Sequence, residues 1–462
     1  MQVGVRYGEG RLVRQYRSFQ AILEGLLLNA LVLASNGYAF CLMLRSMLER
    51  WHLAGSLDLA GLLMIGFFAA AAAYAVIVGF RGLARSDAVG FFAVIVAGIM
   101  LAAFVLARLP DGLSSLATKE AVRAGQPVFG AWPNKDAFGP LLLLAVGWWH
   151  SAPGRGMLIQ RVVASRDEAS AMKTVGAFAA LHYVVRPWSW YVVGAAALLY
   201  LPAGANPEGA LPLIAGRLLP PGFFGMILAV TTLAFMGCVN SRLNFGASYI
   251  VNDVAAPLLP SVGPVWMRLI EIATVIALTI SAVFLVRAGI VSQIRALYQF
   301  LAMMLAGTGF VAIARWYWWR TTIVCEIASL NSAVVVAGVA ALLFDIARPT
   351  EFAEAVAVNF LVGAVTTVVA ALVGRPTASE VVRHFNDKVS PGGPGWPPLG
   401  SREANAFGIL ATRWLLATGA LFAIVAAGSR LLALAYRDAA IALAAAGTCL
   451  LITAILPAKR LV

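Results

Sequence analysis

Long apolar segments separated by short polar connections run through almost the whole chain. A helix needs about twenty mostly apolar residues to cross the hydrocarbon core of a bilayer. The pattern therefore predicts an all-α integral membrane protein with about 12 transmembrane helices. The expected spans are residues 20–44, 59–80, 88–107, 138–161, 174–200, 222–250, 266–286, 296–314, 323–345, 352–373, 407–428 and 438–456.

One of these spans, 138–161, is interrupted near its middle. Its apolar run reaches Trp148 and Trp149, then His150–Gly156 bring in Pro, Gly and Arg, and Met157–Val163 resume the run. Backbone groups that leave the helical ladder in lipid have no water to satisfy them, so a break is tolerated only inside protein or beside a wet cavity. Secondary transporters commonly bind their substrates at such breaks. A Pro-Gly turn that joins two ordinary helices at the surface is an equally good interpretation of this stretch alone.

The composition excludes a soluble protein, because 61% of the residues are hydrophobic and only 12% are charged. The formal net charge of +13 does not indicate nucleic-acid binding, because Lys and Arg are scattered over short connections. Under the positive-inside rule they favour a cytoplasmic N-terminus, although basic residues in the connection 108–136 run against that trend.

The sequence offers no catalytic or metal-ligating constellation. The four cysteines lie in separate apolar spans, which argues against a disulfide framework. No nucleotide-binding loop, catalytic triad spacing or metal-ligand cluster is present. We therefore expect neither an enzyme nor a cofactor, and no transition-metal site.

Several polar residues lie inside apolar spans, where they are expected to face other helices or a cavity. Glu24, Asn29 and Asn36 fall in the first span. His182 and Arg186 fall in the fifth, and an arginine near mid-membrane costs at least ~2.5 kcal/mol on insertion scales. A functional cavity is therefore the first interpretation for the fifth span, and structural pairing is the alternative.

The sixth span, 222–250, is unusually polar and also rich in small residues. Asn240, Ser241, Arg242 and Asn244 cannot all face lipid. The small side chains also predict close helix packing. They are Gly237, Ser241, Gly246 and Ala247.

Two further features lie at expected membrane edges. Asp87 fits an interfacial helix start, which the helix dipole favours, and an ion ligand is the other interpretation. The segment ARWYWWRTT, with Arg315 and Arg320, is interpreted as an aromatic belt that anchors the eighth span at the interface.

Several of these segments resemble motifs of one transporter family. GMLIQRVVASRDEASAMKT is similar to the Gln-Arg signature that follows the sixth core helix of the sodium:solute symporter family. MGCVNSRLNFGASYIVND resembles that family's eighth core helix, and YAVIVGFRGLARSDAVGFF resembles its segment ending in a Thr-Asp pair. VRYGEGRLVRQYRSFQAILEGLLLNALVL, HYVVRPWSW and GTGFVAIARWYWWR resemble a bacterial subgroup of the same family. Together the matches cover most of residues 5–330.

This resemblance implies a LeuT-type fold, in which two inverted five-helix repeats meet around a central site. Spans four to eight would form the second repeat, whereas spans one to three match only the third to fifth helices of the first. The first repeat is therefore expected to be incomplete, which leaves room for a partner chain that supplies the missing helices. The resemblance also implies the inner membrane of a bacterium.

The resulting organisation has seven parts. They are a basic cytoplasmic leader (1–19), a partial first repeat (20–107), an extracytoplasmic loop (108–136), a second repeat with the break at 150–156 (137–318), accessory helices (319–374), a Pro/Gly-rich loop (375–406) and C-terminal helices (407–462).

The resemblance places the sodium ligands of the eighth core helix at Ala234, Gly237 and Cys238. The first contributes a backbone carbonyl in the family, and the other two normally carry hydroxyl groups. Gly237 has no side chain and the sulfur of Cys238 is soft, whereas sodium prefers oxygen. Arg242 follows one helical turn later, and we hypothesise that its guanidinium occupies the sodium position or repels cations from it. Asp87 matches the family aspartate near the cytoplasmic sodium exit.

The same comparison yields candidate substrate contacts, none of which keeps the sugar-binding residue of the galactose transporter. Trp148 and Ser151 fall at a sugar-contact and an inner-gate position. His182 replaces a lysine of that transporter, and Arg186 follows one turn later. Tyr298 or Gln299 falls near a polar contact on the tenth helix.

Two functions remain open on the sequence alone. The first is secondary active transport of a small organic solute, coupled to an ion that is expected to be sodium. The second is a transporter-derived membrane module without transport activity, which acts as a sensor or a partner subunit or results from truncation.

Overall fold

The computed structural model of the protein describes residues 2–116 apart from 54, 56, 110 and 113, then 162, 164–200, 207–389, 395–396 and 404–456. Within these ranges the regular elements are all helices, and one isolated bridge joins Trp318 to Gly395. Ten helical segments among them are long and apolar enough to cross a membrane. They are Arg11–Arg50, Leu59–Gly79, Arg85–Arg108, Pro221–Leu258, Pro264–Arg287, Ile294–Tyr317, Ile323–Leu343, Thr350–Val373, Gly408–Leu432 and Tyr436–Ile455.

These ten segments coincide with ten of the predicted spans, which confirms the predicted helical membrane class. The predicted span 138–161 and its break at 150–156 lie outside the described residues. The predicted span 174–200 is helical, but its polar residues leave it outside the group of ten. It consists of α8 (Glu168–Ala179), the π-helical turn η4 (Ala180–Val185) and α9 (Arg186–Tyr200).

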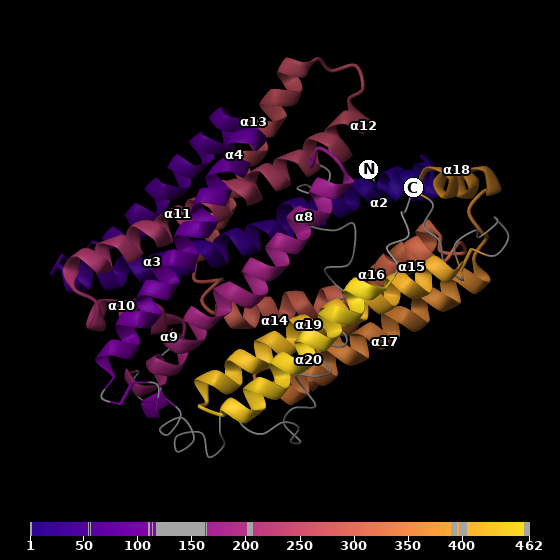
Figure 1. Ribbon diagram of the computed structural model, residues 1–462. Coiled ribbons are helices and arrows are strands. Elements are labelled where there is room, and N and C mark those ends of the chain that lie inside the picture. Colours follow the sequence, from indigo (N-terminus) through magenta and orange to yellow (C-terminus); the bar gives the residue numbers. More distant parts are fainter. Residues whose placement is uncertain are drawn as a thin grey trace.

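Four long helices, α3, α4, α11 and α13, pack against one another as a first group (Figure 1). Aromatic rings pack between them, and the stacked rings of Phe40 and Phe235 have centroids 4.3 Å apart. In lipid, side-chain packing of this kind holds helices together, because lipid tails are as apolar as the side chains. The group consists of α3 (Leu28–Arg50), α4 (Leu59–Arg108), α11 (Pro221–Tyr249) and α13 (Pro264–Arg287), and the short α10 (Ala210–Leu218) packs against α3 and α4.

Helix α4 contains a bend that divides it into two spans. Gly79 adopts φ 66° inside the helix, a left-handed conformation that glycine accommodates without a Cβ clash. The bend separates Leu59–Gly79 from Arg85–Arg108, as the two predicted spans require. Asp87 therefore lies in the first turn of the second half, where the helix dipole favours a carboxylate.

Asp58 caps the other end of α4. Its carboxylate accepts the backbone N–H of Gly61 at 3.2 Å and pairs with Arg287 of α13. The Gly61 hydrogen bond, and after it the Arg287 guanidinium, lower the pKa of Asp58 from its ordinary value. The cap thus ties the start of α4 to the end of α13.

The first long helix begins earlier than predicted. The turn η1 (Leu23–Leu27) joins α2 (Arg11–Ile22) to α3 without a break, so half of the basic leader belongs to the helix. Its η1 turn crosses α11 closely, where a Cβ on Gly246 would lie 2.5 Å from the carbonyl oxygen of Gly25. Beside this crossing, Asn29 donates to the carbonyl of Arg242 at 2.8 Å, which confirms that Asn29 faces another helix.

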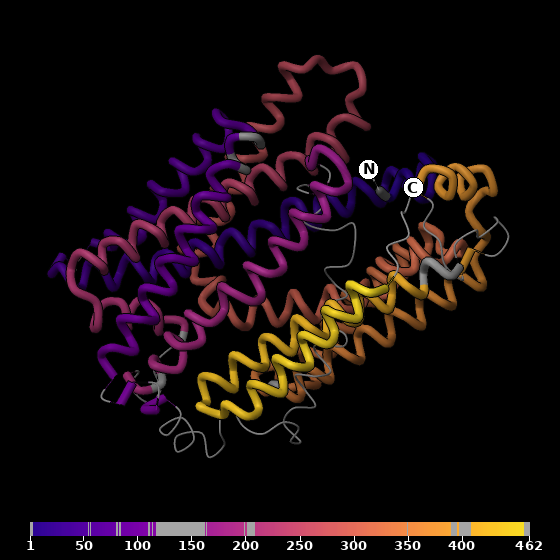
Figure 2. Tube along the Cα trace, in the orientation of Figure 1, coloured from indigo at the N-terminus to yellow at the C-terminus, as the bar shows by residue number. Residues whose placement is uncertain are grey.

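Helices α14 to α18 form a second group beside the first (Figures 1 and 2). Asn359 joins three of them, because its amide donates to the carbonyls of Met303 at 2.7 Å and Ala333 at 3.0 Å. The group consists of α14 (Ile294–Ala306), α15 (Gly309–Tyr317), α16 (Ile323–Leu343), α17 (Pro349–Val373) and α18 (Ser379–Val389). Helices α19 (Ala404–Leu432) and α20 (Tyr436–Ile455) pack against each other, and α19 contacts η4. Helix α18 shows that part of the predicted Pro/Gly-rich loop is helical.

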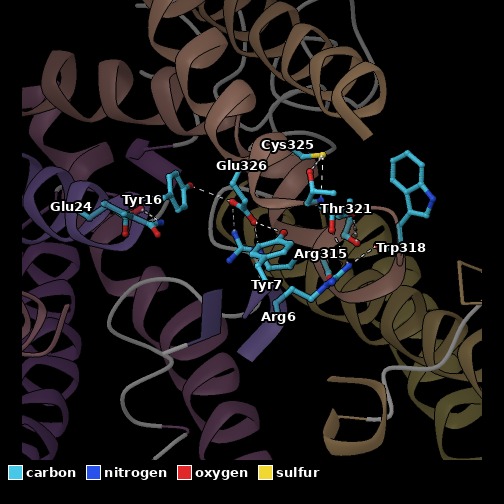
Figure 3. Close-up of polar contacts among 12 residues, drawn as sticks. Arg6, Tyr7, Tyr16, Glu24, Arg315, Trp318, Thr321, Cys325 and Glu326 are labelled. Atoms are coloured by element: carbon cyan, nitrogen blue, oxygen red, sulfur yellow. Dashed lines mark hydrogen bonds and ion pairs between the residues drawn. The ribbon is translucent and has the colours of Figure 1, made fainter. Parts of the chain in front are cut away.

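A buried polar network joins the N-terminal helix α1 (Gln2–Tyr7) to the turn between α15 and α16 (Figure 3). Arg6 is 1% exposed, and its guanidinium donates to the carbonyls of Arg315, Trp318, Trp319 and Thr321 at 2.6–3.1 Å. These carbonyls include helix-end groups that have no partner within α15. Arg6 therefore caps this turn from a residue more than 300 positions away in the sequence.

The carboxylate of Glu326 lies at the centre of this network and is fully buried. It accepts the hydroxyls of Tyr7 at 3.0 Å and Tyr16 at 3.3 Å. Arg315 pairs with it at 3.0 Å and is only 3% exposed. The prediction that Arg315 anchors the chain at the membrane interface is therefore wrong, because its charge is neutralised inside the protein.

Candidate functional site

The predicted aspartate of the ion site lies against helix α11. Asp87 accepts the hydroxyl of Ser241 at 2.6 Å, a short distance typical of a hydrogen bond to an ionised carboxylate. Its other oxygen would lie 3.2 Å from a Cβ on Gly237. Asp87 of α4 and the predicted sodium position on α11 thus lie together.

The positions that directly follow Gly237 and Ser241 on α11 add Cys238 and Arg242. The thiol of Cys238 lies within hydrogen-bonding reach of the Arg242 guanidinium and of the Asn36 amide, and close enough to Asp87 for an electrostatic interaction. The Nε atom of Arg242 is buried and has no hydrogen-bond partner within the described residues. The cluster on this face of α11, which we call the α4–α11 cluster, comprises Asp87, Gly237, Cys238, Ser241 and Arg242.

The helix α8–η4–α9 brings a second set of polar groups to the same region. Arg186 and His182 are one turn apart, with 3.3 Å between Nη1 of the arginine and Nδ1 of the histidine. Arg186 also interacts electrostatically with Cys238 of the α4–α11 cluster. The His182 ring stacks on Phe178, with centroids 4.7 Å apart and 12° between the planes.

The amino-acid sequence matches a known protein family. The sequence profile of the sodium:solute symporter family matches residues 6–323, more than half of the chain. The chain belongs to the sodium:solute symporter family. No curated protein matches the sequence significantly.

A solved structure supports the LeuT-type fold expected of a sodium:solute symporter. The substrate-bound, outward-open state of a Na⁺-coupled sialic acid symporter aligns with a TM-score of 0.64 at 16% sequence identity. The alignment covers 82% of this chain and 77% of that one. At this identity the likeness shows the fold and leaves the solute of the present chain undetermined.

The symporter fold does not bring all the predicted residues together. Ala234 lies on α11, one turn before Cys238. Gln299 of α14 donates to the carbonyl of Ile346 at 2.8 Å, and no hydrogen bond in the described part of the chain joins Gln299 or Tyr298 to the α4–α11 cluster. Trp148 and Ser151 lie outside the described residues.

The structure adds Ser241 to the candidate site of this symporter. In the sequence, Ser241 stands out as a polar and small residue of the sixth span and not as a site residue, because nothing local shows that Asp87, 154 residues away, faces it. The available signal was helical spacing, since Ser241 follows Gly237 by four residues and shares its face. Ser241 carries a hydroxyl about one turn beyond the two positions that lack hydroxyls.

Proposed function

We propose that this chain carries out secondary active transport of a small organic solute, coupled to a cation gradient in which sodium is the expected ion. The family membership supports the class of activity. The observation that carries the ion coupling is the position of the Asp87 carboxylate against Gly237 and Ser241. A carboxylate and a hydroxyl are hard oxygen ligands of the kind that sodium prefers.

Within this proposal, the α4–α11 cluster responds to the ion, and His182 and Arg186 contact the solute. Tyr298, Gln299, Trp148 and Ser151 remain further candidate solute contacts. Alternating access would rock one set of helices against another around this region. The N-terminus would lie in the cytoplasm, following the distribution of basic residues.

Arg242 makes sodium binding in the present chain unfavourable. Its guanidinium lies beside Cys238, a predicted sodium position, and places a positive charge there. Together with the missing hydroxyls, this observation supports a second candidate function, a transporter-derived membrane module without transport activity. The two candidates differ in whether an ion gradient drives solute accumulation.

The direct test measures the cation first, because the solute is unidentified. The purified full chain is heated in NaCl, KCl and choline chloride at equal ionic strength, as wild type and as the variant Gly237→Ser/Cys238→Ser/Arg242→Gln. We expect the triple variant to gain a sodium-specific rise in Tm, because two hydroxyls return beside Asp87 and the competing charge is removed. Gly225→Ser, where an added Cβ meets nothing within 4 Å, is the matched control on the same helix.

A triple variant that responds equally to all three cations would rule out the α4–α11 cluster as an ion site. Proteoliposomes then separate the two functions. The chain is reconstituted into the vesicles, and a mixture of amino acids, organic acids and sugars is added outside. Uptake is measured with and without an inward sodium or proton gradient. Gradient-driven accumulation of any of them supports transport, and its absence under both gradients supports the inactive module.

A further inference from the structure

Arg186 lies on the helix α8–η4–α9, which packs against α4. The Cys238 thiol of α11 interacts electrostatically with Arg186, and the His182 ring nitrogen lies 3.3 Å from its guanidinium. Within the described residues no carboxylate pairs with it. An unpaired guanidinium at membrane depth is unfavourable and marks a functional position.

A second guanidinium and an indole add further unused donors nearby. Arg242 approaches the same thiol, and its Nε atom is buried without a hydrogen-bond partner. Trp190, one turn after Arg186, buries an Nε1–H that also has no partner among the described residues. The Arg242 and Trp190 side chains therefore each keep an unused buried donor, and the indole lies beside Gly98 of α4.

Among the groups that the structure describes here, positive charges outnumber negative ones. Two arginines approach Cys238, whereas Asp87 is the one carboxylate that the described residues place near it. Asp87 also accepts the hydroxyl of Ser241, so part of its hydrogen-bonding capacity is already used. One further negative charge would neutralise the region.

We propose that the transported solute carries a carboxylate and that Arg186 binds it; this inference rests on the proposed transport function. The planar guanidinium donates two parallel hydrogen bonds to a carboxylate, and the contact with His182 fixes its orientation. The stacked rings of Phe178 and His182 provide an apolar wall for the rest of the solute. A monoanion balances the excess charge, whereas a neutral sugar leaves it uncompensated and a cation increases it.

The side of this helix opposite Arg186 packs against α19. Trp188 lies two residues after Arg186, nearly half a turn around the helix. Its indole occupies the space beside Gly428 of α19. The α19 contact therefore covers the side away from Arg186, whereas Phe91 of α4 lies near His182 on the other side, with ring centroids 6.4 Å apart.

The test compares acids with their neutral amides on the purified full chain. The probes are lactate, nicotinate, benzoate and succinate against lactamide, nicotinamide, benzamide and succinamide, with chloride at matched ionic strength. We expect Tm to rise with at least one acid and not with its amide. Arg186→Gln should weaken the apparent affinity for that acid at least about tenfold, since it removes one partner of a charged pair.

Two variants serve as controls for the charge and its geometry. Arg186→Lys keeps the charge but not the bidentate fork, so it should bind more weakly than wild type and more tightly than Arg186→Gln. Arg437→Gln removes an exposed arginine of α20 and should bind the acid as wild type does. Amides that stabilise as well as acids, or an acid that stabilises Arg186→Gln fully, would overturn the proposal.

A ligand-free measurement covers the case in which Arg186→Gln does not fold. Cys238→Asp places a carboxylate within electrostatic reach of both arginines and should raise Tm above that of Cys238→Asn, which has the same shape without the charge. It should also abolish stabilisation by the acid. Equal Tm values for the two variants, or no acid response in the wild type, would count against an anion site.

Uptake distinguishes failure of this inference from failure of the proposed function. Acid binding without gradient-driven accumulation would remove transport and keep the anion site. Gradient-driven uptake of a neutral solute that persists in Arg186→Gln would keep transport and remove the anion site.

Discussion

Glu326 shows how single residues neutralise charge inside this protein. Its carboxylate is fully buried and engages Arg315 and the hydroxyls of Tyr7 and Tyr16. Leaving a buried carboxylate without donors costs several kcal/mol, so each of these contacts offsets part of the desolvation. Arg186 provides the contrast, because its described neighbours supply no negative charge.

The contribution of Tyr7 to the stability of the folded state decreases at alkaline pH. Burial, and next the Glu326 carboxylate, raise the pKa of Tyr7 well above its ordinary value of 10.0. The folded state therefore holds the phenolic proton more tightly than the unfolded state does. The contribution is complete below about pH 10 and is lost as the pH rises above that value.

We therefore expect Tyr7→Phe to reduce the stability by about 1–3 kcal/mol at pH 8, because Glu326 loses a donor. The difference in Tm between wild type and Tyr7→Phe should shrink at pH 10.5. Tyr436→Phe, at a tyrosine that is 65% exposed, corrects for general alkaline effects. A difference that stays constant between the two pH values would show that Tyr7 does not titrate differently on folding.

At the scale of elements, glycines allow the backbones of α11 and the first long helix to come close where the two helices cross. Gly25 and Gly246 meet there, and Asn29 bridges to the carbonyl of Arg242. The small residues of the sixth span predicted this close approach, because a glycine allows helices to pack backbone to backbone. Its partner could not be predicted, since no local pattern identifies which of the other helices α11 meets.

Gly246→Ala tests this crossing. The new Cβ would lie 2.5 Å from the Gly25 carbonyl oxygen and 2.8 Å from Nδ2 of Asn29. The helices must separate, so we expect a loss of about 1–3 kcal/mol, as in other overpacked interiors. Thermal unfolding in detergent measures the loss, and Gly225→Ala on the open side of α11 should leave Tm unchanged. Equal Tm values for the two variants would mean that the crossing is adaptable.

For the whole molecule, sequence patterns predicted the membrane spans well and the buried polar contacts poorly. Span positions follow from local hydropathy, which lipid imposes on each helix separately. By sequence alone, Arg6 is assigned to the basic leader and Arg315 to an interfacial belt, because a sequence does not reveal a partner more than 300 residues away. The same limit applies to Asp87 and Ser241, whose pairing depends on the register of α4 against α11.

The N-terminal segment connects the two helical groups and gives the last prediction. Helix α1 packs against α18, and Arg6 caps the turn between α15 and α16, while α2 continues into the first group (Figure 1). Arg6→Gln removes the guanidinium that donates to four carbonyls. We expect it to destabilise this junction by about 3 kcal/mol. Amide hydrogen exchange in residues 315–322 should accelerate on the order of 100-fold, while α11 keeps its protection.

Arg11→Gln removes an exposed charge from the same segment and should leave this exchange unchanged. Equal acceleration in α11 and at residues 315–322 would mean that Arg6 supports the whole fold. Confinement of the effect to residues 315–322 and α18 would mean that the junction opens without unfolding the first group. In that case the N-terminal segment can separate from the second group, while the direct packing of α3 against α14 still joins the two groups.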